Sequence, residues 1–251
     1  MVSYLCKLIF NMEKFFRYLG HKAGPSIRKG KWIYHSYFAD KATALESEYI
    51  VGHELANHML RELQVIDNAE KNELITNIGT QLYSRVVNKE RKFKFNIVSS
   101  KEVNAFALPG GFIFVTDALL EKCQFDRDEI AFVLAHEMVH VVLRHPLKRI
   151  LSNFSLKIVE NVVRTRGTTG QLAKRALSSF LRNGYSRENE LEADKYGVRL
   201  ITSAGFDASG AFRLLNHLRQ NKSDNPDIFN YFSSHPPIDE RMGQIKYIMK
   251  Q

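Results

Sequence analysis

Two histidines four positions apart, with a glutamate directly after the first, form the pattern His136-Glu137-xx-His140. On a helix, residues four apart lie on one face, so both imidazoles can reach a single Zn²⁺. Glu137 points just off that face, where its carboxylate can hydrogen-bond the metal's water without binding the metal. The pattern therefore predicts a zinc site with Glu137 as the general base.

The surroundings of the pattern favour burial, because residues 128–145 are apolar almost all round the predicted helix. Buried histidine and glutamate side chains are costly unless something pairs them. The alternative is a core helix in which His136 and His140 are merely hydrogen-bonded. His145 falls just before a proline, and we predict that it caps the end of this helix rather than binding metal.

A catalytic zinc site keeps three protein ligands and leaves the fourth position to water. Candidates for the third ligand follow Ser186, which is a capping residue for a helix that ends near Gly205. Glu190 and Asp194 share one face of that helix, so one can bind zinc while the other hydrogen-bonds a ligand histidine. We expect Glu188 and Glu192 to lie on other faces of that helix, exposed to solvent. Spacing favours Glu190 but leaves open an acidic, solvated helix.

Three further stretches strengthen the pattern: residues 103–115, 128–135 and 234–241. Together with His136-Glu137-xx-His140 and Glu190-Leu-Glu-Ala-Asp194, they resemble the soluble-domain branch of the M48 zinc metallopeptidases, from about residue 45 onward. The resemblance implies one Zn²⁺ per chain, with Glu190 as its third protein ligand and Asp194 as the partner of a ligand histidine. It also implies a zincin-type fold.

Three other features are candidates for substrate binding or regulation. His235 lies in a proline-flanked loop, and the resemblance implies that it can occupy the open zinc position, restrain activity, or stabilise an oxyanion when displaced. The alternative is a histidine of a surface loop. Arg241 is expected to bind a substrate carbonyl or a nearby carboxylate. A strand edge can add a substrate peptide, unless it is covered like an ordinary hairpin strand; the predicted edge comprises Asn104, Ala105, Phe106, Ala107 and Leu108.

The elements that must position these residues follow from periodicity and turn residues. Helices are predicted over residues 41–64, 68–88, 149–164 and 170–182, and a short one after Thr116. Strands are predicted over residues 93–98, 103–108 and 112–115. The expected fold class is α+β: mostly helical, with a small antiparallel sheet beside the His136 helix. We expect a metallopeptidase domain over residues 32–251.

Residues 1–31 form a basic segment with a predicted amphipathic helix over residues 3–20. Such a helix can lie on an anionic membrane or pack on the main domain. No run of apolar residues is long enough to span a membrane, and no clear signal peptide is present. We expect a cytoplasmic or peripheral membrane protein. The two cysteines carry no metal-type spacing.

The net charge of +9 is spread over several segments, so no nucleic-acid partner is expected. The predicted function is a zinc-dependent endopeptidase that hydrolyses protein substrates, misfolded or membrane-associated ones in particular. The alternative is a catalytically restrained, zinc-binding chaperone on the same fold. Glu137 argues against a purely structural metal site, which has no use for a base. The sequence leaves the oligomeric state open.

Overall fold

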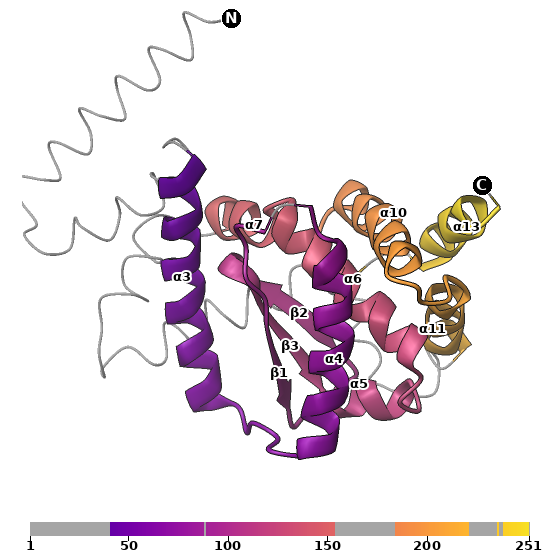
Figure 1. Ribbon diagram of the computed structural model, residues 1–251, viewed down its shortest axis with the longest axis horizontal. Helices are drawn as coiled ribbons and strands as arrows, with labels where there is room; N and C mark the ends of the chain where they lie inside the picture. The colour runs from indigo at the N-terminus through magenta and orange to yellow at the C-terminus, as the bar shows by residue number, and fades with distance from the viewer. Residues whose placement is uncertain (1–40, 88, 154–183, 221–234, 236–237, 251) are drawn as a thin grey trace, which may run out of the picture.

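A computed structural model describes residues 41–87, 89–153, 184–220, 235 and 238–250 (Figure 1). The predicted helices over residues 3–20 and 170–182, residues 154–164 of the helix predicted over 149–164, and the domain boundary after residue 31 lie outside these ranges. The described helices are α3 (Lys41–Glu62), α4 (Ala69–Arg85), α5 (Asp117–Lys122), α6 (Arg127–Val142), α7 (His145–Asn153), α10 (Arg187–Ser203), α11 (Ser209–Gln220) and α13 (Ile238–Ile248).

The sheet has three strands, β1 (Lys94–Val98), β2 (Ala105–Leu108) and β3 (Phe112–Thr116), in the order β1-β3-β2. The predicted strands and the α+β class are confirmed. β2 and β3 form the expected antiparallel hairpin, but β1 pairs with β3 in parallel, so the expectation of a purely antiparallel sheet is wrong. The chain crosses from one edge of the sheet to the other between β1 and β2, which leaves β2 at an edge.

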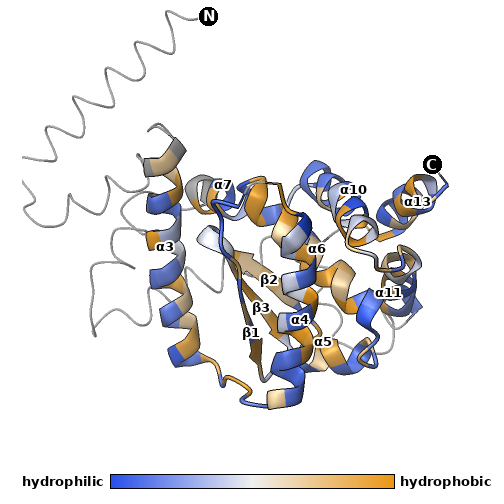
Figure 2. Cartoon of the chain, in the orientation of Figure 1, coloured by the Kyte–Doolittle hydropathy of each residue, from blue (hydrophilic) through white to orange (hydrophobic). Residues whose placement is uncertain are grey.

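Helices cover both faces of the sheet, since every residue of β2 and β3 is buried and nearly all of them are apolar (Figure 2). Ile97, Ile113 and Val115 join one hydrophobic cluster with buried residues of α4 and α6. Phe106 and Phe114 join a second cluster with residues of α3 and α7. The sheet is thus the middle layer of a three-layer arrangement.

Helix α3 packs tightly on the turn between β2 and β3, a 3-10 turn (η2) at Pro109–Gly111. A methyl group at Gly52 would lie 1.7 Å from the carbonyl oxygen of Pro109, so only glycine permits this approach. The buried carboxylate of Glu48 lies at the same contact. It accepts hydrogen bonds from both terminal guanidinium nitrogens of Arg91, at 2.6 and 3.1 Å, and one from Nε of Arg144 at 3.0 Å.

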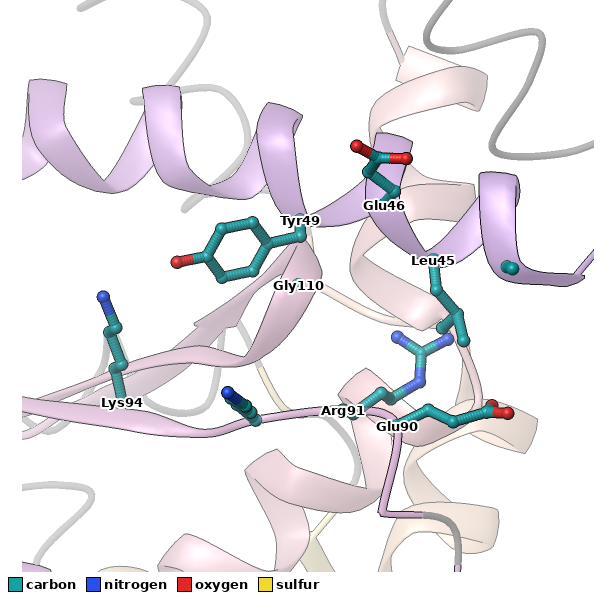
Figure 3. A pocket seen from close by; sticks show the side chains of 9 residues that line it. Leu45, Glu46, Tyr49, Glu90, Arg91, Lys94 and Gly110 are labelled. Carbon is teal, nitrogen blue, oxygen red and sulfur yellow. The ribbon is translucent and has the colours of Figure 1, made fainter.

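A cavity of about 660 Å³ opens beside this contact, between α3 and the start of β1 (Figure 3). Tyr49, Arg91 and Lys94 are among the residues that line it. The residues that line it do not include His136, Glu137, His140, Glu190 or His235, so this cavity is separate from the predicted metal site.

The central helix α6 begins at an Asp126 cap, whose carboxylate accepts hydrogen bonds from two backbone amides of the first turn, at 2.9 and 3.0 Å. It ends at Val142, because Arg144 takes a left-handed conformation with φ of 62°. His145 therefore starts α7, and the prediction that it caps the end of α6 is wrong. In the described part of the chain, no helix has the length and apolarity needed to cross a membrane.

Candidate metal centre

Four buried side chains converge at the centre of the molecule: His136 and His140 from α6, Glu190 from α10, and His235. One potential ligand atom from each lies within 4.8 Å of the others. The two histidines are one turn apart on α6, and α10 packs along α6 so closely that a methyl group at Gly197 would lie 3.5 Å from the backbone of His136. This contact brings Glu190 to the histidines.

The donor atoms are spaced as zinc ligands require. The Nε2 atoms of His136 and His140 are 3.0 Å apart, and the carboxylate of Glu190 lies 3.3 Å from Nε2 of His140 and 3.6 Å from Nε2 of His136. Ligands placed about 2.0–2.1 Å from a tetrahedral zinc ion are about 3.3 Å from each other. These three residues therefore fit such an ion.

The ring of His136 is held by a charged group on the side away from these donors. Its Nδ1 lies 2.9 Å from Oδ1 of Asp194, which orients Nε2 toward Glu190. Arg241 donates to both oxygens of Asp194 at 2.8 Å and lies 3.1 Å from Glu190. Of the two roles expected for Arg241, these contacts correspond to carboxylate binding.

In this cluster, burial and the neighbouring groups shift the pKa values in opposite directions. Burial would raise the pKa of Glu190, but interactions with the facing His235 and Arg241 lower it well below the usual range. Burial would likewise raise the pKa of Asp194, and Arg241 lowers it. Burial and Arg241 disfavour protonated His136, yet hydrogen bonds to Asp194 and Glu190 raise its pKa to about 9. The buried cluster thus favours an added positive charge at His136.

His140, the second candidate ligand, has a different environment. Nδ1 of His140 lies 2.8 Å from Nδ1 of His145. The ring of Tyr185 stacks on His140 with a centroid distance of 4.0 Å and an interplanar angle of 15°. Burial lowers the pKa of His140 well below its usual value, and burial followed by Lys148 lowers the pKa of His145 to about 4. Both imidazoles are therefore neutral near neutral pH.

Glu137 lies beside the donors without joining them. Its Oε1 is 3.5 Å from Nε2 of His235, and its buried Oε2 has no hydrogen-bond partner among the described residues. Burial raises the pKa of Glu137, so its carboxylate is a stronger base than an exposed one. An unpaired carboxylate oxygen next to a metal-type donor set is the arrangement that a general base for water requires.

His235 closes the group on the open side. Its Nδ1 lies 3.0 and 3.1 Å from the two oxygens of Glu190, and its Nε2 lies 3.4 Å from the carbonyl oxygen of Ala105. This histidine is buried, unlike a histidine of an ordinary surface loop. It therefore connects the donor set to the edge strand β2.

The edge of β2 faces this group through its backbone. Thr116 N–H donates to the carbonyl of Asn104 at 3.0 Å, so Asn104 pairs with β3. Hydrogen-bonded and non-bonded pairs alternate in an antiparallel ladder, which directs the backbone groups of Ala105 and Ala107 away from β3. The side chains of Phe106 and Leu108 pack in the core beneath.

The structure brings seven of the predicted site residues into one cluster: His136, Glu137, His140, Glu190, Asp194, His235 and Arg241. Glu188 and Glu192 are exposed, as expected. Sequence reasoning missed Tyr185 and the contact between His140 and His145. A tyrosine directly before the α10 cap, and a third histidine soon after the metal-type pair, were the available signals.

Comparison with known proteins agrees with this geometry. The sequence profile of peptidase family M48 matches residues 68–249. The mitochondrial metalloendopeptidase OMA1 of Schizosaccharomyces pombe is 31% identical over 156 residues, covering 62% of this chain and 46% of that protein. The metalloprotease YcaL of Escherichia coli is 28% identical over 160 residues, covering 61% and 60%.

The beta-barrel assembly-enhancing protease of Escherichia coli is 27% identical over 190 residues, which cover 67% of this chain and 38% of that protein. The chain thus spans less than two thirds of the length of these relatives. The profile match covers more than half of the chain and includes every residue of the donor set, and the chain therefore belongs to peptidase family M48.

Proposed function

We propose that this protein is a zinc-dependent endopeptidase in which His136, His140 and Glu190 hold the metal ion and Glu137 is the general base. The observation that carries the proposal is the buried donor set with an unpaired oxygen of Glu137 beside it. A purely structural zinc site would leave that carboxylate without a role.

Zn²⁺ at this position would supply a Lewis acid that polarises a peptide carbonyl and lowers the pKa of water. Glu137 accepts the proton of the attacking water and returns it to the leaving amine nitrogen. The burial that raises the pKa of Glu137 suits both steps, because the same group must take up a proton and release it near neutral pH. Asp194 keeps His136 oriented, and Arg241 offsets part of the negative charge of the buried carboxylates of Glu190 and Asp194.

We further propose that a substrate peptide pairs with the edge of β2 opposite β3, over residues 104–108, which are buried in this structure. The outward backbone groups of Ala105 and Ala107 support this, since they can exchange hydrogen bonds with an extended peptide. The carbonyl of Ala105 is already next to His235 and the donor set. A peptide bound along this edge would therefore pass the catalytic group.

His235 supports a restrained resting state. Its contacts with Glu190 and its proximity to Glu137 put an imidazole on the side where water and substrate must enter. The enzyme becomes active when this imidazole moves away. A permanently restrained chaperone on the same fold is the second candidate function, and this contact is the observation that favours it.

The substrates that we propose are misfolded or membrane-associated proteins. The name of one relative connects it to β-barrel assembly, which supports this class. The membrane contact expected for residues 1–31 remains part of the proposal. It would bring the catalytic domain to substrates at a membrane surface.

The deciding experiment is digestion of an unfolded protein such as casein by the full chain, with and without a chelator and after zinc is restored. We expect chelation to stop cleavage and zinc to restore it. Glu137→Gln should keep the metal and lower the rate by about 100-fold or more. Cleavage that survives both chelation and Glu137→Gln would contradict the proposed enzyme. A zinc-loaded wild type with no cleavage, even after His235→Ala, would favour the chaperone.

A further inference from the structure

His145 contacts His140 but is not one of the four residues of the donor set. We propose that His145 is a positioning residue, which fixes the ring and the tautomer of His140 so that Nε2 of His140 is left for the metal. This inference rests on the proposed function only in that the metal is zinc.

Hydrogen-bond chemistry permits one consistent arrangement of this pair. Two imidazole nitrogens 2.8 Å apart must be one donor and one acceptor. His140 can offer a lone pair at Nε2 only if its hydrogen is on Nδ1, so His140 donates and Nδ1 of His145 accepts. The hydrogen of His145 is then on its Nε2, which faces a carboxylate oxygen of Glu192 at 3.6 Å. That separation is too long for a hydrogen bond but favours the same tautomer by electrostatic attraction.

The backbone is arranged to deliver His145 to this position. Helix α6 ends three residues before His145, at Val142, and Arg144 adopts a left-handed φ of 62°, which is uncommon for a residue with a side chain. Nε of Arg144 donates to the buried carboxylate of Glu48 on α3 at 3.0 Å. A sharp turn, held from a second helix, thus folds His145 back onto the end of α6, where it is fully buried.

The ring of His140 is consequently fixed in two directions. Tyr185 covers its face at a centroid distance of 4.0 Å, and His145 holds its edge. His136 differs, because its partner is the carboxylate of Asp194. Asp194 adds a negative charge beside His136, whereas the neutral His145 adds none beside His140. Two carboxylate partners would have added twice as much negative charge to the buried centre. His145 can therefore accept the hydrogen bond without adding to the charge that Arg241 must offset.

The test compares His145→Phe, which keeps a ring but removes the acceptor, with His145→Asn, whose amide oxygen can take the place of Nδ1. His53→Asn is the control, since that histidine lies on α3 and makes its polar contact with Asn57. Zinc affinity is measured by competition with a chromophoric chelator on the full chain. We expect His145→Phe to bind zinc about 10–100-fold more weakly, and His145→Asn to recover most of that loss.

Two readouts separate positioning from general damage. Thermal melts of the metal-free proteins show whether each variant is folded. Long-range ¹H–¹⁵N spectra of zinc-loaded wild type, labelled at histidine, show which nitrogen of His140 carries hydrogen, and we expect Nδ1. This second measurement needs no substitution, so it stands even if His145→Phe does not fold.

Unchanged zinc affinity in folded His145→Phe, or a hydrogen on Nε2 of His140, would overturn the inference while leaving the proposed function intact. Equal losses in His145→Phe and His145→Asn would also overturn it, because volume rather than the acceptor would then matter. A wild type that binds no zinc at all would instead overturn the proposed function, and this inference with it.

Discussion

Nδ1 of His136 lies 2.9 Å from Oδ1 of Asp194, although the two residues are 58 positions apart in the chain. Arg241 reaches the same carboxylate from a third element, α13, with two hydrogen bonds of 2.8 Å. Three helices therefore meet in one charged, fully buried network. The metal centre and the packing of α6, α10 and α13 depend on the same contacts.

Substitution of Arg241 should show how far the stability of the protein depends on this buried network. Arg241→Met leaves the carboxylates of Glu190 and Asp194 buried without their main counter-charge, and we expect the free energy of unfolding to fall by about 3–5 kcal/mol. Urea denaturation of the metal-free protein measures it. Arg219→Met is the control, because its ion pair with Asp239 is exposed and should change stability by less than about 1 kcal/mol. Equal losses in the two variants would show that the buried network is not special.

The choice of the third ligand can be tested within one helix. Glu190→Ala should lower the zinc content of purified protein, whereas Glu192→Ala should leave it near that of wild type. Glu190 is buried in the donor set, and the side chain of Glu192 is 46% exposed. Metal analysis of both proteins, together with casein digestion, is sufficient. Loss of zinc in Glu192→Ala alone would reverse the assignment.

His235 should restrain the resting protein. His235→Ala removes the imidazole that contacts Glu190 and approaches Glu137, so basal casein cleavage should rise while zinc content stays near one per chain. The matched control is His217→Ala, which removes a histidine on α11 paired with Glu129. No rise in His235→Ala would be inconsistent with a gate, and a lower rate would favour the oxyanion-stabilising role.

Zinc affinity should depend on pH through His136. Its pKa of about 9 in the metal-free protein lies above the ordinary value of 6.5, so zinc must displace a proton at neutral pH. Affinity should rise about tenfold per pH unit from pH 7 toward pH 9 and then level off. In the metal-free protein the same shift stabilises the fold below pH 6.5, and this contribution is lost as the pH rises through 9.

Calorimetry in buffers of different ionisation enthalpy measures the protons released on zinc binding, and we expect about one at pH 7.5. Asp194→Asn should flatten the pH dependence, because the hydrogen bond to Asp194 is a principal cause of the raised pKa of His136. An affinity that does not change between pH 7 and 9 would contradict this account.

The contact of α3 with the hairpin turn predicts a large effect from a small substitution. Gly52→Ala would put a methyl group 1.7 Å from the carbonyl oxygen of Pro109, so α3 must shift, at a cost of at least about 1–3 kcal/mol. Gly243→Ala, in α13, meets open space and should instead stabilise the protein by about 0.5–1 kcal/mol. Thermal or urea unfolding distinguishes the two, and a neutral Gly52→Ala would mean that α3 is loosely held.

The sequence was sufficient to predict the elements that carry the metal-type donors. His136 and His140 share a helix because they are four apart, and the α10 boundaries follow from a Ser186 cap and a glycine with φ of 85° at Gly205. These are local properties, set by spacing and by capping hydrogen bonds. Such local properties can therefore be predicted from the residue types alone.

The relationships that sequence analysis missed are those that depend on packing between distant segments. No residue type marks the turn at Arg144, since arginine seldom adopts a left-handed φ, and so the position of His145 was misjudged. Glu48 resembles an ordinary surface acid of an amphipathic helix until Arg91 and Arg144 are placed beside it. The parallel pairing of β1 with β3 likewise depends on where the chain places β2 in the sheet, which no residue type indicates.

The order of the network along the chain has a consequence for synthesis. A ribosome releases His136, Glu137 and His140 first, then Glu190 and Asp194, and only later Arg241, which offsets part of the charge of those carboxylates. Before Arg241 emerges, two acids would have to enter the core with no guanidinium beside them, which opposes their burial. The buried donor set can therefore be completed with its counter-charge in place only after Arg241 has been synthesised.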